Sequence, residues 1–283
     1  MYLRIIIIFL SIFATILRVH ADGETFTDGD FTFRVISDNE CEVTGSPNPP
    51  NPLVIPSTAT FNGNVYTVTR IGSAAFFDRK ACVIVYHGEG TYFGDLVLPN
   101  TITSIGDSAF MNCKGLTGSL KLPEGLMTIG KRAFSGCGKV TYFPGDGDIY
   151  VEGEAWASGD TLLGFTGPLI IPESVTTIGY QAFRGSNFSG DLIIPDAVTE
   201  LGLGAFDFTL FNGKLKISNS LKVIKERTFF GFVIQDDLKI PDSVTAIKSD
   251  AFGHCRFNGK LILSNNLTTK TVLLLLEQFM TVT

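Results

Sequence analysis

The chain is poor in the residues on which most metalloenzymes and nucleic-acid-binding proteins depend. It has three histidines and one tryptophan among 283 residues, and charged side chains make up only 18% of it. Its 22 lysines and arginines are outnumbered by 28 aspartates and glutamates, which gives a formal net charge of −6. Because nucleic-acid binding depends on neutralising phosphates with basic side chains, we expect no nucleic-acid partner for so acidic a chain.

Long hydrophobic runs are also scarce. One run, Ile5 to Leu17, follows Arg4 and precedes Val19-His20-Ala21, the small-residue spacing that signal peptidase reads. The run is shorter than the roughly 20 apolar residues of a spanning helix, which makes a membrane anchor the less favoured alternative. We therefore expect residues 1–21 to be a cleaved signal peptide and the mature chain to have no transmembrane span. Losing Arg4 and Arg18 would take the charge from −6 to −8.

What the sequence has in abundance is one repeated segment. Its copies begin at Leu residues that are 24 residues apart once and then 23 residues apart four times. The copies are LVLPNTITSIGDSAF at Leu96, LKLPEGLMTIGKRAF at Leu120, LIIPESVTTIGYQAF at Leu169, LIIPDAVTELGLGAF at Leu192, LKISNSLKVIKERTF at Leu215, LKIPDSVTAIKSDAF at Leu238 and the opening of another at Leu261. A period of this length predicts a solenoid, in which each unit is stable only against its neighbours.

Within each unit, two apolar patterns indicate two short strands. The Leu-x-Ile-Pro step and the Val-x-x-Ile-Gly step both alternate, and the proline between them marks a corner. The glycine before Ala-Phe is expected to make a turn that other residues cannot adopt. The aromatic residue of each unit is expected to stack in one buried column, made of Phe110, Phe134, Phe183, Phe206, Phe229 and Phe252.

Two further units are expected whose sequences depart from the consensus. The first begins at Leu53 and contains Asn62-Gly63, a strong hairpin-turn signal. Before it, Phe31 to Val43 alternates as two strands do, so we predict an N-terminal β cap over residues 22–52. The second lies between Leu120 and Leu169. There, Tyr142-Phe143-Pro144 and Gly153-Glu154-Ala155-Trp156 are interpreted as a worn unit that places Trp156 in the phenylalanine column.

The predicted fold is a β-rich solenoid with an N-terminal β cap. It is an array of about eight units of 23–24 residues, with short strands and tight turns, over residues 53–268. Residues 269–283 abandon the repeat and form an atypical C-terminal tail. That tail is either an apolar cap helix or the stub of a longer array.

The consensus L-x-I-P-x-x-V-T-x-I-G-x-x-A-F-x-x-C resembles the BspA-like leucine-rich repeat proteins. The resemblance covers Leu53 to Thr268 and includes the elongated first unit. It implies a leucine-rich repeat array on a secreted or cell-surface protein of mouth and gut bacteria or parasitic protists. It also implies adhesion to host matrix proteins or other microbes, and it implies no catalytic residues.

Candidate chemistry is sparse. His254 beside Cys255 could suggest a metal ligand or a nucleophile, but a turn residue is the favoured interpretation because no third group is indicated. The acidic cluster of Asp146, Asp148, Glu152 and Glu154 lacks the spacing of a calcium loop, and a solvated corner is favoured. We therefore predict no enzyme activity, metal or cofactor.

Three cysteines share one place in the repeat. Cys113, Cys137 and Cys255 each follow their phenylalanine by three residues, so the first two should lie on adjacent coils. A disulfide is conceivable at that spacing. A column of buried thiols is favoured, because side chains in one column point the same way and cysteine is readily buried.

A binding surface is predicted on the Leu-x-Ile-Pro strands, where the middle residue should face outward. These residues are Val97, Lys121, Tyr142, Ile170, Ile193, Lys216, Lys239 and Ile262. An apolar centre bordered by lysine is typical of an interaction patch, so the candidate binding residues are Tyr142, Ile170, Ile193, Lys121 and Lys216. Equally, β-branched residues could stand there because they suit a strand.

Length variation offers a second candidate surface. Residues Phe77 to Tyr92 and Ala157 to Gly164 are insertions that leave the same edge of the array. Protruding loops on a rigid scaffold commonly carry function, although unselected loop growth is at least as good an account.

The predicted function is adhesion or recognition through the solenoid surface. Expected partners are protein ligands, such as host extracellular-matrix proteins or other cell-surface proteins. The alternative is a passive structural spacer, as a piece of a larger surface protein.

Overall fold

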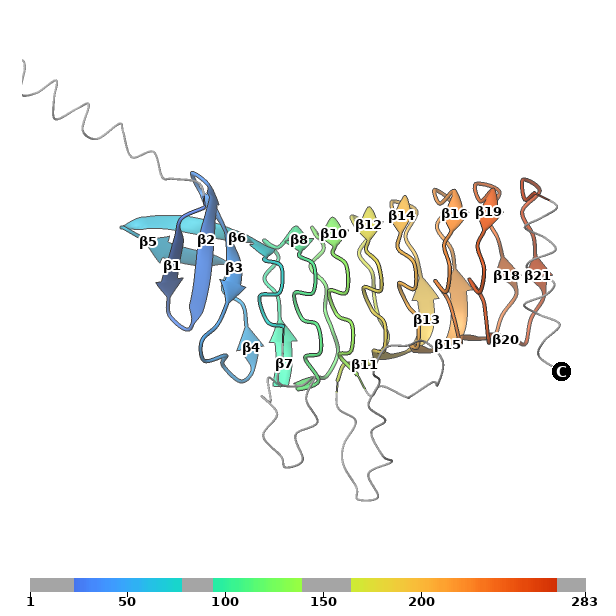
Figure 1. Ribbon diagram of the computed structural model, residues 1–283, viewed down its shortest axis with the longest axis horizontal. Helices are drawn as coiled ribbons and strands as arrows, with labels where there is room; N and C mark the ends of the chain where they lie inside the picture. Colours follow the sequence, from blue (N-terminus) through green and yellow to red (C-terminus); the bar gives the residue numbers. More distant parts are fainter. Residues whose placement is uncertain (1–22, 78–93, 139–163, 269–283) are drawn as a thin grey trace, which may run out of the picture.

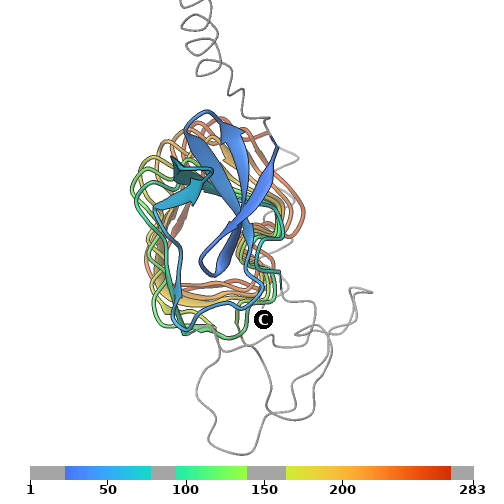
Figure 2. The same cartoon turned by 90° about the vertical axis from the view of Figure 1, so that its left-hand side faces the viewer.

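The computed structural model describes residues 23–77, 94–138 and 164–268. The chain winds into eight coils stacked along one axis, with antiparallel strands at the N-terminal end (Figures 1 and 2). Only strands and turns, and no helix, occur within these three ranges. The coils begin at Leu53, Leu96, Leu120, Leu169, Leu192, Leu215, Leu238 and Leu261. The predicted solenoid is confirmed.

Two strand rows run along the stack. The Ile-Gly row consists of β6 (Asn64–Ile71), β8 (Ser104–Ile105), β10 (Thr128–Ile129), β12 (Thr177–Ile178), β14 (Glu200–Leu201), β16 (Val223–Ile224) and β19 (Ala246–Ile247). The Leu-x-Ile strands and the segments that lead into them are β4 (Leu53–Val54), β7 (Gly94–Val97), β9 (Leu116–Thr117), β11 (Thr166–Gly167), β13 (Asn187–Ile193), β15 (Leu210–Lys216), β17 (Val233–Ile234), β18 (Leu238–Lys239), β20 (Arg256–Phe257) and β21 (Leu261–Ile262). Pairing between coils is parallel throughout, as a solenoid requires.

The cap follows the predicted pattern. Strand β2 (Phe31–Ser37) pairs antiparallel with β1 (Thr25–Asp28) and β3 (Glu40–Gly45). Strand β3 then pairs parallel with β6, which joins the cap to the Ile-Gly row. Strand β5 (Thr58–Phe61) forms a hairpin with β6 through Asn62 and Gly63, whose φ angles are 51° and 78°. Those positive angles explain the Asn-Gly signal.

The proline that follows the Leu-x-Ile strand begins a tight corner in five coils. Its carbonyl oxygen accepts a hydrogen bond from the backbone N–H three residues later, as in Ile102 N–H to Pro99 at 3.1 Å. The same bond forms from Leu126 to Pro123, Val175 to Pro172, Val198 to Pro195 and Val244 to Pro241. The predicted corner between the two strands is confirmed.

The phenylalanine column forms the core. Its six predicted members stack from coil to coil, and Phe76 of the first coil extends the column. Ring centroids lie 5.2 to 6.2 Å apart, and Phe110 to Phe252 are at most 1% exposed. Burying one such side chain stabilises the fold by about 1.5–3 kcal/mol, so the column is a major source of stability.

The role expected for the glycine of the Ile-Gly step is wrong. None of the glycines at this step has a positive φ, and the left-handed residue lies two places further on, at Ser108, Arg132, Gln181, Gly204, Arg227 and Asp250. Instead, a Cβ on Gly130 or Gly179 would lie 2.6 Å from backbone atoms of the preceding coil. The glycine is needed for close stacking of coils.

The predicted worn unit is also wrong. Thr128 and Ile129 pair directly with Thr177 and Ile178, and Phe134 stacks on Phe183 at 5.5 Å. No coil can therefore lie between these two coils, and the column has no place for Trp156 there. Trp156 and the Tyr142-Phe143-Pro144 step lie outside the described residues.

A close contact between the two ends of this insertion explains the error. A Cβ added to Gly164 would collide with Gly138 and with the carbonyl of Cys137, so the two glycines meet. Leaving out residues 139–163, which number 25, shortens the 49-residue interval from Leu120 to Leu169 to 24 residues. This is the spacing from Leu96 to Leu120.

The Ile-Gly row is interrupted once among the described coils. Strand β14 does not pair with β16, although β16 pairs with β19. At this step Gly202 of one coil is followed by Lys225 in the next and by Lys248 after that. Because lysine has a Cβ, the coil with Lys225 cannot approach the preceding coil as closely as a coil with glycine does. The Phe206–Phe229 separation of 6.2 Å is accordingly the longest in the column. The ladder resumes where both coils carry lysine.

Candidate binding surface

The outward residues of the Leu-x-Ile strands form one continuous row. The flanking residues point into the core, as the exposed fractions of Leu169 (3%), Ile170 (73%) and Ile171 (6%) show. We call these residues the outer row; it consists of Val54, Val97, Lys121, Ile170, Ile193, Lys216, Lys239 and Ile262. Lys121 pairs with Ile170, and Ile193 pairs with Lys216. The strand alternation therefore places four of the five candidate residues on the surface.

Exposed apolar side chains gather in the outer row. Eight large hydrophobic residues are exposed among those described, and five of them belong to this row: Val54, Val97, Ile170, Ile193 and Ile262. Ile170 and Ile193 occupy the same place in consecutive coils, with Lys121 in the coil before and Lys216 in the coil after. An apolar pair bordered by lysine is suited to contact a protein partner, because the apolar centre can be desolvated while the rim stays hydrated.

Tyr142 does not belong to the outer row between Lys121 and Ile170, because those two residues pair directly. Tyr142 itself lies outside the described residues, as does nearly all of the second candidate surface, Phe77 to Tyr92 and Ala157 to Gly164. Sequence reasoning missed Leu210, which begins β15 and is 53% exposed. The sequence carries no signal for it, because Leu210 and Phe211 are both apolar and only the burial pattern of β15 shows which of the two faces outward.

The cysteine column contains buried thiols, as favoured from the sequence. Cys113, Cys137 and Cys255 are all buried, and Cys137 and Cys255 are free thiols. Their Sγ atoms donate to the carbonyl oxygens of the phenylalanines in the preceding coil, at 2.9, 2.8 and 3.0 Å. Burial raises the pKa of Cys137 and of Cys255 to about 12. These thiols are therefore protonated at neutral pH and unsuited to nucleophilic attack.

His254 is a turn residue. It has a φ of 56°, is exposed, and packs its ring 4.8 Å from that of Phe230. Among the described residues, no group of three or more His, Cys, Asp or Glu side chains is arranged to hold a metal ion. The acidic cluster from Asp146 to Glu154 lies outside the described residues.

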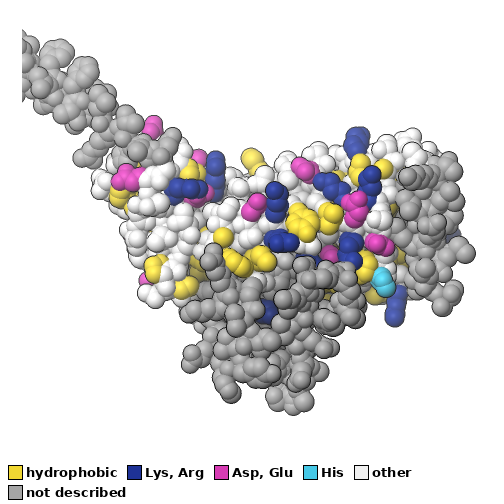
Figure 3. Space-filling view, viewed as in Figure 1, with side chains coloured by type: hydrophobic (Ala, Val, Ile, Leu, Met, Phe, Trp, Pro, Cys, Tyr) yellow, Lys and Arg dark blue, Asp and Glu magenta, His cyan; other side chains and the backbone are white. Residues whose placement is uncertain are grey.

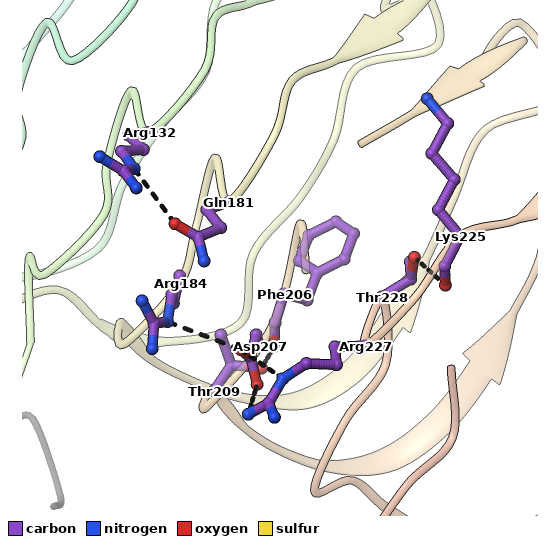
Figure 4. Close-up of polar contacts among 9 residues, drawn as sticks. All are labelled: Arg132, Gln181, Arg184, Phe206, Asp207, Thr209, Lys225, Arg227 and Thr228. Atoms are coloured by element: carbon purple, nitrogen blue, oxygen red, sulfur yellow. Dashed lines mark hydrogen bonds and ion pairs between the residues drawn. The ribbon is translucent and has the colours of Figure 1, made fainter. Parts of the chain in front are cut away.

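A buried ionic cluster links three consecutive coils. Asp207, whose side chain is 2% exposed, lies between Arg184 at 3.5 Å and Arg227 at 3.2 Å (Figure 4). Both guanidinium groups also pack on the ring of Phe208, and Arg227 lies 4.1 Å from the centroid of Phe230. The carboxylate is thus held on both sides, and the pair with Arg227 crosses the junction where β14 and β16 are unpaired.

Charge on the visible face is mixed. Figure 3 shows basic, acidic and hydrophobic side chains interspersed over the coils, without a broad area of one sign. Such a surface favours recognition by shape and local pairing over long-range attraction of a polyanion. Within the described ranges, no helix is long and apolar enough to cross a membrane.

Comparison with known proteins agrees with this architecture. A leucine-rich cell-surface protein of Faecalibacterium prausnitzii A2-165 has a TM-score of 0.59 and 24% identity, covering 83% of this chain and 55% of its own. This likeness shows the solenoid fold, and the chain spans 55% of that protein's length. A leucine-rich repeat protein of Bacteroides ovatus has a TM-score of 0.46 and 21% identity, covering 84% and 71%. Among curated proteins, nothing matches the chain.

The sequence pattern of one repeat family covers more than half of the chain. The BspA-type leucine-rich repeat region matches residues 85–154 and 166–271, in six copies. From Leu96 onward, the matched residues include the Leu-x-Ile strands, the glycine step and the phenylalanine column. This chain therefore belongs to the BspA-type leucine-rich repeat family.

Proposed function

We propose that this protein is an exported recognition module that attaches to protein partners through its outer row. The partners are host extracellular-matrix proteins or proteins on the surface of other cells. Contact centres on Ile170 and Ile193, with Lys121 and Lys216 at the rim.

The observation that supports this proposal most directly is the concentration of exposed apolar side chains in one row. Ile170 is 73% exposed and Ile193 is 44% exposed on a rigid strand framework. Burying apolar area releases about 25 cal/mol per Å², and a pre-formed sheet loses little conformational entropy on binding. Scattered exposed hydrophobics need no explanation, whereas an aligned set does.

Three observations support export and a surface location. The apolar run with its small-residue cleavage pattern has the form of a signal peptide. Leucine-rich repeat domains in general bind proteins. The F. prausnitzii protein of the same fold is described as a cell-surface protein.

Binding to immobilised laminin, collagen and fibronectin, and to whole cells, tests the proposal. The double variant Ile170→Asp/Ile193→Asp should bind at least tenfold more weakly, because two charges would be buried at the contact. The matched control is Val65→Asp, which places the same charge on a residue 64% exposed in the cap hairpin. We expect this control to bind as the unchanged protein does.

Thermal unfolding of each variant checks that the fold is kept, since both isoleucines project into solvent. Equal attachment by the double variant and the unchanged protein would overturn the outer row as the binding surface. A protein that attaches to no matrix protein or cell in any form would favour the spacer function instead.

A further inference from the structure

A second surface feature, separate from the outer row, lies on the Ile-Gly strands. A groove of about 670 Å³ crosses β8, β10, β12 and β14 in turn. Its floor is the glycine of each coil, at Gly106, Gly130, Gly179 and Gly202. One wall is formed by Ser104, Thr128, Thr177 and Glu200, and the other by Asp107, Lys131, Tyr180 and Leu203. The groove therefore runs along the solenoid axis and takes equivalent positions from each coil.

The groove is a consequence of how the coils stack. A Cβ on Gly106, Gly130 or Gly179 would lie 2.6 to 2.7 Å from backbone atoms of the preceding coil, so no side chain can stand on the floor. Five coils in succession carry this glycine, from Gly72 to Gly202, and the groove ends at the sixth coil, where Lys225 replaces it. The hollow is thus permanent in the folded protein.

The floor offers no peptide group to an added strand. Each glycine N–H donates to the isoleucine carbonyl of the preceding coil, at 2.8 Å in all four cases. Each glycine carbonyl accepts from the alanine N–H three residues later, at 3.2 to 3.4 Å. An extended peptide that binds by adding a strand needs unpaired backbone groups, so the groove does not suit this kind of ligand.

The walls carry polar groups with no net charge. Two carboxylates, Asp107 and Glu200, are matched by Lys131 and Lys225. Asp107 accepts from the backbone N–H of Lys131 at 2.8 Å, and Glu200 lies 3.6 Å from the Lys225 ammonium group. The hydroxyls of Ser104, Thr128 and Thr177, which both donate and accept, form the rest of one wall. A neutral ligand rich in hydroxyl groups matches this chemistry.

Tyr180 adds a partly exposed aromatic ring at the middle of the groove. The guanidinium of Arg132 lies 5.2 Å from its centroid, which fixes the ring from one side. An aromatic ring beside hydroxyls and carboxylates offers both an apolar face and hydrogen bonds. This is the combination that a sugar ring, with its C–H faces and hydroxyl edges, can use.

We propose that this groove binds a neutral, linear glycan along the solenoid axis. Equivalent wall residues recur at the coil spacing of roughly 4.8 Å, whereas an extended peptide advances about 3.3 Å per residue and would fall out of register. One sugar unit of an extended hexose polymer advances by a length close to the coil spacing. Successive units can therefore meet equivalent groups on successive coils.

Titration calorimetry on the full chain tests the proposal. The probes are cellohexaose, mannohexaose, xylohexaose and maltohexaose, with hexagalacturonate as the anionic comparison and a flexible Gly-Ser hexapeptide as the peptide comparison. We expect at least one neutral hexasaccharide to bind. Tyr180→Ala and the double variant Thr128→Val/Thr177→Val should each weaken that binding by about tenfold, since each removes contacts worth on the order of 1 kcal/mol.

Two comparisons keep the test decisive. Thr→Val nearly preserves side-chain shape, so the double variant answers the question if Tyr180→Ala lowers the folded fraction. Ile170→Asp changes the outer row alone and should leave glycan binding unchanged. The proposal is overturned if no neutral hexasaccharide binds at millimolar concentration, if the anionic or peptide probe binds as well, or if both groove variants keep full affinity.

Discussion

One place in the repeat, three residues after the column phenylalanine, carries different side chains in successive coils. Cys137 donates from Sγ to the carbonyl of Phe110, and Ser186 donates from Oγ to the carbonyl of Phe134 at 3.0 Å. The shared requirement is a small buried donor that satisfies a carbonyl of the coil before. Sulfur chemistry is not needed there, which agrees with the free thiols.

Alkaline pH should destabilise the fold through these thiols. Burial raises the pKa of Cys137 and Cys255 from 9.0 to about 12, so the folded state holds their protons more tightly than the unfolded state. Their contribution is complete below pH 9 and is lost as the pH rises from 9 towards 12. Thermal midpoints measured between pH 7 and 11 should fall above pH 9.

The control for this prediction is Cys137→Ser/Cys255→Ser, which removes both titrating groups and keeps a hydroxyl donor. The decline above pH 9 should be shallower in this variant. An equally steep decline would show that the alkaline loss arises elsewhere.

Several coils place a non-glycine residue in the left-handed conformation, which is strained for a residue with a Cβ. Asp250 has a φ of 54° and is exposed, while Gly204 at the equivalent position has a φ of 58°. A left-handed backbone costs about 1–2 kcal/mol for a residue with a Cβ. Glycine avoids this cost, but part of the gain is lost because glycine gives up more conformational entropy on folding. Asp250→Gly should therefore raise the free energy of unfolding by about 0.5–1 kcal/mol in urea titrations. Asp250→Ala keeps the Cβ, and a gain from alanine as large as that from glycine would contradict this explanation.

At the scale of elements, a buried ion pair bridges the junction at which β14 and β16 do not pair. Asp207 pairs with Arg227 across it, and both groups are largely buried. Removing the carboxylate leaves two guanidinium groups uncompensated.

Asp207→Ala should lower the free energy of unfolding by about 2–3 kcal/mol, measured by urea denaturation. The matched control is Asp236→Ala. Asp236 lies 3.4 Å from Lys214 of the neighbouring coil, and both side chains are more than half exposed. That change should cost about 0.5 kcal/mol or less. Similar losses in the two variants would mean that burial does not distinguish them.

The local pattern was sufficient to predict most elements. Alternation fixed which residues of each Leu-x-Ile step face outward, so Ile170 and Ile193 were found from sequence, and the prolines fixed the corners. The glycine was misread because a single segment shows a turn preference, whereas the close approach of Gly179 to Gly130 exists only between coils. The groove was missed for the same reason, since its floor is defined by that approach.

At the scale of the whole molecule, the chain tolerates a long insertion because its ends meet. The segment Tyr142-Phe143-Pro144 resembles the Leu-x-Leu-Pro step, so the sequence pattern alone predicted another coil. The pairing of Ile129 with Ile178, which are 49 positions apart, shows that no coil lies between the coils that begin at Leu120 and Leu169. Local periodicity carries no information on such a contact.

Joining Gly138 directly to Gly164 should therefore leave the stack intact. The deletion restores a 24-residue unit and removes no residue of the phenylalanine column. The thermal midpoint should stay within about 5 °C, because the chain length between two points of a stack that already meet changes the unfolding free energy little. A control deletion of equal length, residues 176–200, cuts through the coil beginning at Leu169 and should abolish cooperative unfolding. Loss of cooperativity in the first deletion would show that the insertion supports the stack.

The missing ladder between β14 and β16 also has a mechanical meaning. Coils contact only their neighbours, so a solenoid behaves as a rod whose stiffness is set junction by junction. At this junction β13 and β15 remain paired, whereas β14 and β16 share no ladder bond, and the backbone bonds beyond them run from Gly204 to Glu226 and from Phe206 to Thr228. Bending that opens the Ile-Gly side meets less resistance than bending that opens the other. An array pulled between a cell and its ligand would therefore curve first here, and in one direction.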